Sequence, residues 1–590
     1  MPRRLCWLLV LCTAALAQKQ KKAGEEIPPV KIDFTVTAPD GAFVRGLNAT
    51  SFTVTQDGKP VKLVEVSQVD APFRTLVFVV DDLGLSLDGL HFVQRALRQF
   101  VGTQVKPGDR IGILRTGIHR GEDLQFTSDT SQLTAAIEGL HYNQLRDIGV
   151  KPADAFEAGT LLQLRFLMDA LKKRPARCAV VLLSERLEAP PGVSSGRVDP
   201  EHSAERITEK ATEARAVLYA IRVHPAPAAN TAFPLRTGLA AVVNDTGGLW
   251  IDGPAGLSTA FARVLDDQSR YYSATIVPPE WEVDFSNGDF RSTTGFVRKI
   301  SIQTARSGVT VRAHRAAYPS LDTDSPLLPG YAGEESTSPI DDGAIGIRAT
   351  PLLYYGPDGP YVDVLLHIEG KGLTFVKRPD GRYRTSFGVM SVAFDGNQQS
   401  AGEAGRTLEY SLTEAELHAV IADGFLLSHR FRVQRTGVFQ VRTSVLNEAT
   451  GRAGSAGEYL EIPSIEDGKL TVSGITLEEQ PRPRAAMRQF RPGTRISYGL
   501  QVYNLTPDTT SHKCTAEVHM RLFRSGVQIF SGQLSTVTFD VTARKAYGVG
   551  GTLGLSPEIV PGHYVMQLTV ADKVANSAPV SRLIDLEVRP

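Results

Sequence analysis

The sequence predicts a multidomain protein of mixed class, α/β plus all-β. An α/β domain with a mostly parallel sheet and helices on both faces is expected to follow a small β unit and to precede two β-sandwiches. Three observations support this prediction. The chain has 590 residues, too many for one hydrophobic core; short apolar runs alternate with helical segments between residues 73 and 279; and apolar and polar residues alternate over most of the chain beyond residue 345.

The first residues predict an export signal, residues 1–17. Two arginines precede the apolar stretch LCWLLVLCTAAL, and Ala15-Leu16-Ala17 offers a small-x-small cleavage site. The apolar run is shorter than the roughly 20 residues needed to span a bilayer, and no later stretch is apolar enough to do so. We therefore expect cleavage after Ala17 and a secreted or periplasmic protein with no transmembrane segment after cleavage.

Charge and cysteine content narrow the class of protein further. The 64 Lys and Arg residues balance the 64 Asp and Glu residues, so no basic face for nucleic acid is expected. Signal cleavage would remove Cys6 and Cys12 and leave Cys178 and Cys514, which lie in different predicted domains. No disulfide is expected, and the exported chain would depend on ordinary hydrophobic cores.

Residues 28–70 predict the small N-terminal β unit. Val30, Ile32, Phe34 and Val36 alternate with polar residues, a pattern that buries one face of a strand. A Pro-Asp-Gly turn follows, and the alternation then resumes. A unit this short needs a partner surface to be stable.

Residues 73–279 carry the α/β pattern. The apolar runs are TLVFVV, RIGILR, CAVVLLS, AVLYAIRV, GLWI and YYSATIV. Between them, apolar residues recur at helical spacing, as in residues 90–101 and 161–171. Strands that are apolar throughout and alternate with helices indicate a parallel sheet covered on both faces.

The remainder of the chain is predicted to be mostly strand. Residues 281–318 predict a β extension, and residues 320–345, rich in Ser, Asp, Pro and Gly, predict a linker. Residues 346–480 and 486–590 predict two β-sandwiches of the immunoglobulin or fibronectin III type, which divide near the stretch EEQPRPRAA. One helix is expected among these strands, where a Thr-x-x-Glu capping box begins at residue 413.

A group of acidic and hydroxyl residues follows the apolar strands of the α/β region. Asp81 and Asp82 end the first strand, Glu185 ends a later one, Ser86 lies in the loop after the aspartates, and Thr160 begins a predicted helix. Ligands of open parallel sheets bind outside the carboxyl ends of the strands. These side chains offer the oxygen ligands that Mg²⁺ or Ca²⁺ prefers, so the sequence predicts a metal site that a partner's carboxylate could complete.

The order of elements, with an aspartate after the first apolar strand, resembles the von Willebrand factor A-type domain, which is Rossmann-like. More narrowly, FVVDDLGLS, VKPGDRIGILRTG and AFARVLDDQSRYYSATIVPP are similar to the exported von Willebrand factor A-related proteins of Acidobacteria. The resemblance covers residues 28–320 well and implies architecture more than activity. It also implies a metal-ion-dependent adhesion site, made of an Asp-x-Ser-x-Ser loop, a distal threonine and a distal aspartate.

The loop departs from that pattern. If Asp81 is the leading aspartate, leucines replace both serines; if Asp82 leads, Gly84 replaces the first serine and Ser86 keeps the second. Glu185 stands where the distal aspartate is expected. The alternative interpretation is a metal-free corner in which Ser86 caps the following helix and Glu185 pairs at the surface.

The leading functional hypothesis is a non-enzymatic, exported binding, adhesion or envelope-associated protein. Its degenerate metal adhesion site would meet an extracellular or periplasmic protein or polysaccharide. The alternative is a metal-free structural or assembly scaffold with a vestigial site, and a remote one is an extracellular hydrolase. Catalysis is not expected, because the sequence has no nucleophile elbow, no His-Glu-x-x-His motif and no phosphate-binding glycine loop.

Overall fold

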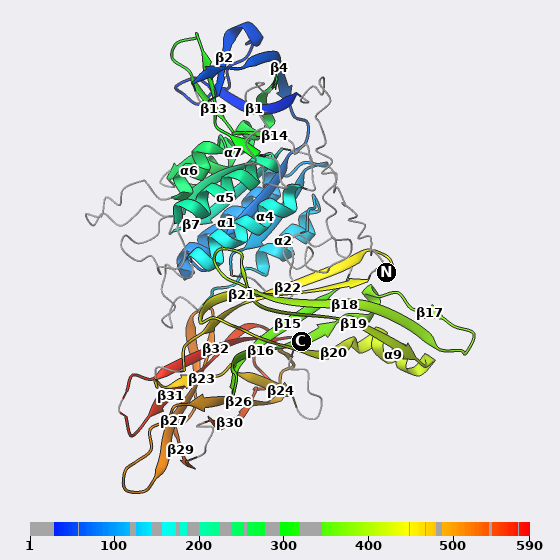
Figure 1. Cartoon of the computed structure of the whole chain (residues 1–590), viewed down its shortest axis with the longest axis vertical. Helices are drawn as coiled ribbons and strands as arrows, with labels where there is room; N and C mark the ends of the chain where they lie inside the picture. The colour runs from blue at the N-terminus through cyan, green and yellow to red at the C-terminus, as the bar shows by residue number, and fades with distance from the viewer. Residues whose placement is uncertain are drawn as a thin grey trace, which may run out of the picture.

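The computed structural model of the chain shows domains in the predicted classes. It describes residues 29–56, 58–117, 125–143, 156–172, 177–185, 200–223, 238–252, 256–277, 296–318, 345–447, 449–465, 468–479, 486–541, 546–575 and 577–590. The helix-rich α/β domain lies between a β domain that holds the first strands and the two C-terminal β-sandwiches (Figure 1). The predicted signal segment and nearly all of the predicted linker lie outside the described residues.

The α/β domain contains a five-stranded parallel sheet. Its order is β6 (Arg110–Arg115), β5 (Thr75–Val80), β7 (Cys178–Ser184), β8 (Ala216–Arg222) and β9 (Trp250–Asp252), with every neighbouring pair parallel. Strands β5 and β7 are apolar except for Thr75 at the start of β5 and Ser184 at the end of β7, because both faces of the sheet are buried.

Helices cover both faces of this sheet, and each face has its own core. Helices α1 (Leu87–Gln104), α2 (Thr130–Glu138) and α7 (Leu257–Ser269) pack on one face; α4 (Leu162–Lys172), α5 (Pro200–Glu213) and α6 (Gly238–Asp245) pack on the other. Successive residues of β5 point to opposite cores: Phe78 contacts Phe100 and Phe261, whereas Val77 and Val79 face α4. The mixed α/β and all-β class is confirmed.

One predicted strand of the parallel sheet lies elsewhere. β10 (Arg270–Val277), the stretch that contains YYSATIV, pairs antiparallel with β1 and β4 in the N-terminal β domain. The physical reason is its alternation: Tyr272, Ala274 and Ile276 are buried, whereas their neighbours are half-buried. This pattern suits a strand with one buried face better than a strand of a doubly covered sheet.

The N-terminal β domain combines the first strands with strands from the predicted β extension. Its sheets have the orders β13-β1-β10-β4, β12-β2-β3 and β11-β14. The strands are β1 (Val30–Thr37), β2 (Phe52–Gln56), β3 (Lys59–Pro60), β4 (Lys62–Asp70), β11 (Phe296–Arg298), β12 (Ile300–Thr304), β13 (Thr310–Ala313) and β14 (Ala316–Tyr318). Strands that follow the α/β domain thus supply the partner surface that the short β unit needs.

The first sandwich packs two antiparallel sheets, β15-β16-β20 and β17-β18-β21-β22 with β19 beside β18. Its elements are β15 (Ile347–Gly356), β16 (Gly359–Ile368), β17 (Val376–Lys377), β18 (Tyr383–Phe394), β19 (Ser400–Leu412), α9 (Glu414–Asp423), β20 (Phe425–Arg432), β21 (Gly437–Asn447) and β22 (Arg452–Ile462). The predicted capping box forms at the start of α9, where Thr413 and Glu416 bond each other's backbone.

The second sandwich begins earlier than the sequence suggested. Its elements are β23 (Thr471–Val472), β24 (Thr476–Glu479), β25 (Gln489–Phe490), β26 (Arg495–Tyr503), β27 (Lys513–Arg524), β28 (Val527–Ser531), β29 (Ser535–Asp540), β30 (Ala546–Gly554), β31 (Gly562–Asp572) and β32 (Val580–Val588). Because β23 and β24 pair with β26, and Val472 and Leu477 join the core of this domain, the division lies before residue 471.

Helix α4 joins the α/β domain to the first sandwich. The rings of Phe166 and Phe394 meet edge to face at 5.2 Å, and the guanidinium of Arg442 lies 4.9 Å from the Phe166 ring. Arg165 donates hydrogen bonds to the carbonyls of Gly396 and Asn397. This helix is therefore buried on two sides, by the parallel sheet and by the sandwich (Figure 1).

Two other expectations concern cysteines and membrane spans. Cys178 and Cys514 are both buried and lie in different domains, on β7 and β27, as expected. Within the described part of the chain, no helix is both long and apolar enough to cross a membrane.

Candidate functional site

The candidate site is built at the carboxyl edge of the parallel sheet. Val80 of β5 lies opposite Arg115 of β6 and Leu183 of β7. The next residues along these three strands are Asp81, Thr116 and Ser184, so the register places a carboxylate between two hydroxyls. Parallel strands end at the same edge, which is why distant parts of the sequence meet here.

Asp81 accepts hydrogen bonds from three hydroxyls. Its Oδ1 accepts from Thr116 Oγ1 at 2.8 Å and from Thr160 Oγ1 at 2.9 Å, and its Oδ2 accepts from Ser184 Oγ at 2.5 Å. The residue is 1% exposed. Burial raises the pKa of this carboxyl above its ordinary value, and the adjacent Asp82 adds to the rise; the three hydroxyls act in the opposite direction.

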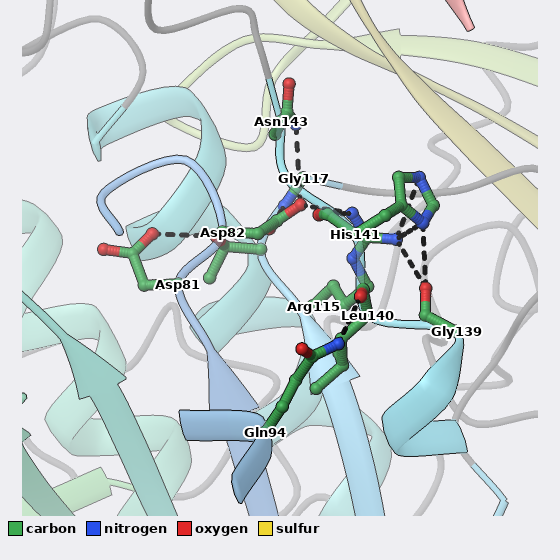
Figure 2. Close-up of polar contacts among 10 residues, drawn as sticks. Asp81, Asp82, Gln94, Arg115, Gly117, Gly139, Leu140, His141 and Asn143 are labelled. Atoms are coloured by element: carbon green, nitrogen blue, oxygen red, sulfur yellow. Dashed lines mark hydrogen bonds and ion pairs between the residues drawn. The ribbon is translucent and has the colours of Figure 1, made fainter. Parts of the chain in front are cut away.

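Asp82 points to a different set of partners (Figure 2). Its Oδ2 forms an ion pair with Arg115 Nη2 at 2.8 Å, and its Oδ1 accepts from the Gly117 backbone N–H at 2.7 Å. Thr116 Oγ1 donates at 3.2 Å and Asn143 Nδ2 at 3.5 Å. Both side chains of the ion pair are buried, so the positive charge facing Asp82 comes from the protein itself.

Arg115 continues this network into the loop after α2. Its Nη2 donates to the backbone carbonyl of His141 at 2.9 Å, and its Nη1 lies 2.9 Å from the Nδ1 of the same histidine. Gln94 of α1 holds the loop from below, donating to the Leu140 carbonyl at 2.7 Å (Figure 2). The guanidinium thus links the carboxylate corner to the loop that carries His141.

Ser86 and Glu185 form a second, smaller group. Ser86 is the N-cap of α1 and accepts from the Gly89 N–H at 3.1 Å, as the metal-free interpretation predicts. Its hydroxyl and its N–H donate to the two oxygens of Glu185 at 2.7 and 2.9 Å. A Cβ at Gly89 would lie 2.1 Å from the Glu185 carboxylate, so a side chain at this position would displace that carboxylate from Ser86.

The first sandwich covers the corner near Thr160. Thr160 lies in a π-helical turn (Phe156–Leu161) that leads into α4, and it is fully buried. Gln440 of β21 reaches the Gly159 carbonyl at 3.5 Å. A Cβ at Gly159 would lie 3.6 Å from the ring of Tyr459 on β22.

Four of the five predicted residues meet in two pairs, and the fifth, Asp82, forms an ion pair with an arginine that was not predicted. Thr160 joins Asp81, Ser86 joins Glu185, and Asp82 joins Arg115. In the described ranges, no group of three or more His, Cys, Asp or Glu side chains is arranged to hold a metal ion. The oxygen donors available to a divalent ion are therefore the Asp81 carboxylate and the three hydroxyls around it. The charge of Asp82 is already compensated by the Arg115 guanidinium.

Sequence reasoning missed three residues of this corner: Arg115, Thr116 and Ser184. Their positions in the sequence pointed to this edge: Arg115 ends β6, Thr116 follows it, and Ser184 ends β7. The strand-end rule that identified Asp81 and Glu185 applies equally to them.

Comparisons with known proteins show a distant structural likeness. No protein family and no curated protein sequence matches the chain. The chain is similar to a conserved hypothetical protein, BatB, from Bacteroides thetaiotaomicron, with 12% identity over 33% of this chain and 96% of that one and a TM-score of 0.22. It is also similar to an aerotolerance-related membrane protein from Bacteroides fragilis, with 13% identity over 33% and 98% and a TM-score of 0.21.

A third solved structure, red sea bream transglutaminase, shows 9% identity over 41% of this chain and 31% of that one, with a TM-score of 0.14. Scores this low establish neither a function nor a partner for this chain.

Proposed function

We propose that this protein is a non-catalytic, envelope-associated scaffold, secreted or periplasmic, whose α/β domain is of the von Willebrand factor A type. The observation that supports this proposal is the carboxylate corner: donors from the same chain satisfy both aspartates, and each aspartate is 1% exposed. A partner's carboxylate has no access to such a corner. The corner instead ties together the carboxyl ends of β5, β6 and β7.

Electrostatics supports the same proposal. Two adjacent buried carboxylates require compensation, which an adhesion site takes from a divalent ion. Here Arg115 supplies one positive charge to Asp82, and burial favours the protonated form of Asp81 by raising its pKa. Both effects weaken the attraction of the corner for a divalent ion.

A second candidate function is metal-dependent binding of an extracellular or periplasmic protein or polysaccharide. The convergence of Thr160, Thr116 and Ser184 on Asp81 favours it, because a hydroxyl that donates its proton to a carboxylate keeps lone pairs for a metal. Asp81 and these hydroxyls would hold Mg²⁺ or Ca²⁺, and the ion would supply a Lewis acid for a partner's carboxylate.

A hydrolase is the weakest of the three. Two described contacts join a serine to a histidine. Ser531 meets His519 at 2.9 Å on the exposed surface of the neighbouring strands β28 and β27, whereas Ser391 meets His429 at 3.2 Å between the sheets of the first sandwich, where both residues are buried. Burial and the nearby Arg406 lower the pKa of His429 to about 4, so its ring is neutral. The pair therefore packs the sandwich and has no route to a substrate.

Calorimetric and thermal-shift titrations of Mg²⁺, Ca²⁺ and Mn²⁺ into the chain without its predicted signal separate the first two functions. The scaffold proposal expects no saturable heat and no rise in melting temperature, in the wild type and in Asp81→Asn alike. Asp252→Asn is the matched control, because Asp252 ends β9 at the same edge and is exposed. An ion-dependent rise that survives in the control and disappears in Asp81→Asn would establish the metal-dependent function instead.

A further inference from the structure

A cavity of about 220 Å³ lies between the α/β domain and the second sandwich. Its first wall is the beginning of α1 with the loop after α2, and its second wall is the β27–β28 turn with the start of β31. The cavity adjoins the His141 loop, which Arg115 links to the carboxylate corner, but the proposed scaffold function does not explain it.

Cationic and titratable side chains gather in this cavity. Its polar lining includes His91, His141, His563 and Arg524, against the single carboxylate of Glu138. The guanidinium of Arg524 donates to the Pro561 carbonyl at a long 3.4 Å. A guanidinium has five N–H donors, so most of them remain for a ligand.

Two of the histidines meet across the domain boundary. The rings of His141 and His563 are stacked, with centroids 4.2 Å apart and planes at 11°. Two protonated rings at this separation repel each other, and an anion beside them removes that repulsion. Titratable and charged groups near the stack include His91 on α1, Glu138 on α2, Arg115 on β6, Arg524 on β27 and Glu587, which lies opposite His563 on β32 and interacts with it electrostatically.

The cavity also has an apolar surface, to which Leu90, Tyr142, Phe523 and Val565 contribute, and Gln94 and Ser525 add neutral polar groups. An apolar cavity of about 150 Å³ takes up a benzene molecule, so this one has room for a ring with a small charged group. Ligand sites of this kind combine an apolar body with a few convergent polar groups and occur at domain boundaries.

We propose that this cavity binds a small organic anion, a carboxylate on an apolar body about the size of benzoate. The carboxylate lies beside Arg524 and the stacked imidazoles, and the apolar body lies against Leu90 and Phe523. The bound anion joins the α/β domain to the second sandwich. His141 also contacts Arg115, so the occupied cavity borders the network of Asp82.

The test is calorimetric titration of benzoate into the chain without its predicted signal, with inorganic phosphate as a second probe. Benzoate is expected to bind saturably, with a dissociation constant below about 1 mM, and more tightly at pH 6 than at pH 8. Arg524→Gln is expected to weaken binding at least about 10-fold. Arg521→Gln is the matched control, since Arg521 precedes Arg524 on β27 and bonds Gln567 outside the cavity.

His563→Phe is the second variant, because it keeps a stacked ring and removes its proton. It is expected to reduce the difference in affinity between pH 6 and pH 8. The proposal is overturned by an absence of saturable benzoate binding, or by Arg524→Gln binding as tightly as Arg521→Gln. Phosphate that binds more tightly than benzoate would also overturn it, because the apolar walls would then have no role. None of these outcomes depends on a divalent ion or on the scaffold function.

Discussion

The ion pair between Asp82 and Arg115 gives a sharp test of how the corner is held together. The side chains are 0% and 9% exposed, and the N–O distance is 2.8 Å. Arg115→Gln leaves the Asp82 carboxylate buried without its cation, which costs about 3–5 kcal/mol of unfolding free energy. Asp82→Asn is expected to cost less, about 2 kcal/mol, because Arg115 keeps its bond to the His141 carbonyl.

The double variant completes a cycle. Once both charges are absent, no uncompensated charge remains, so the double variant should cost about 3–4 kcal/mol rather than the sum of the single changes, a coupling of about 2 kcal/mol. The metal-site hypothesis predicts a different result. If an ion compensated Asp82, Arg115 would contribute little, and the coupling between the two residues would be small.

Trp250 makes the measurement specific to the α/β domain. It begins β9 and packs against the core beside α6. With Trp281→Phe as the background and the signal removed, Trp250 is the single tryptophan, and its fluorescence during urea unfolding follows this domain in a chain of several domains. Costs that add within about 0.5 kcal/mol would refute the coupling argument.

Three further predictions follow from buried groups. Burial raises the pKa of Asp81, so this group contributes stability that is fully present below its ordinary pKa of about 3.9 and is lost as the pH rises through the raised value. In thermal unfolding from pH 4 to 8, Asp81→Asn should lack that loss of stability. At pH 7 the variant should be at least as stable as the wild type. Phe394→Ala removes the ring that meets Phe166, so small-angle scattering should show a larger radius of gyration while the Trp250 signal stays native; an unchanged radius contradicts the docking role. Burial alone would raise the pKa of Asp33, but His314, Arg177 and Arg215 hold it below its ordinary value. The ionised carboxylate therefore contributes to the free energy of unfolding above about pH 4, and this contribution is lost below that pH. In urea unfolding, Asp33→Asn should cost about 2 kcal/mol at pH 7 and much less at pH 3.

The sequence predicted the parallel sheet because β5 and β7 are apolar except for Thr75 at the start of β5 and Ser184 at the end of β7. It misplaced β10 because YYSATIV was judged by its apolar content, whereas its alternation decides the sheet to which it belongs. The boundary between the sandwiches was placed too late because the Pro- and Arg-rich stretch is the more visible break in composition. The strands before it are short, and their pairing with β26 is not visible in the sequence.

The candidate site was predictable in part. Asp81 and Thr160 were identified and do meet, since strand ends and the start of the following helix share one edge. The partner of Asp82 was not identified, because a buried arginine at the end of β6 is indistinguishable in the sequence from an exposed one. Side-chain direction decides between a metal ligand and an ion pair, and two consecutive aspartates must point in different directions.

The sequence also indicates that the first sandwich covers the carboxyl edge of the parallel sheet, through the stretch LLQLRFLMDALK of α4. A helix on the outer face of a sheet needs one apolar stripe, and a helix that is apolar on more than one side is buried on more than one side. In α4, Leu164, Leu167 and Leu171 face the parallel sheet, whereas Leu162 and Phe166 pack against the first sandwich. If the α/β domain presented this edge of the sheet to a partner without the sandwich, Phe166 would be exposed to water, which would cost about 2 kcal/mol or more of hydrophobic free energy. The sandwich is therefore part of the unit that makes α4 stable. The same sandwich contacts Gly159, beside the Thr160 that bonds Asp81, so the Phe394→Ala variant tests how far the corner depends on this interface.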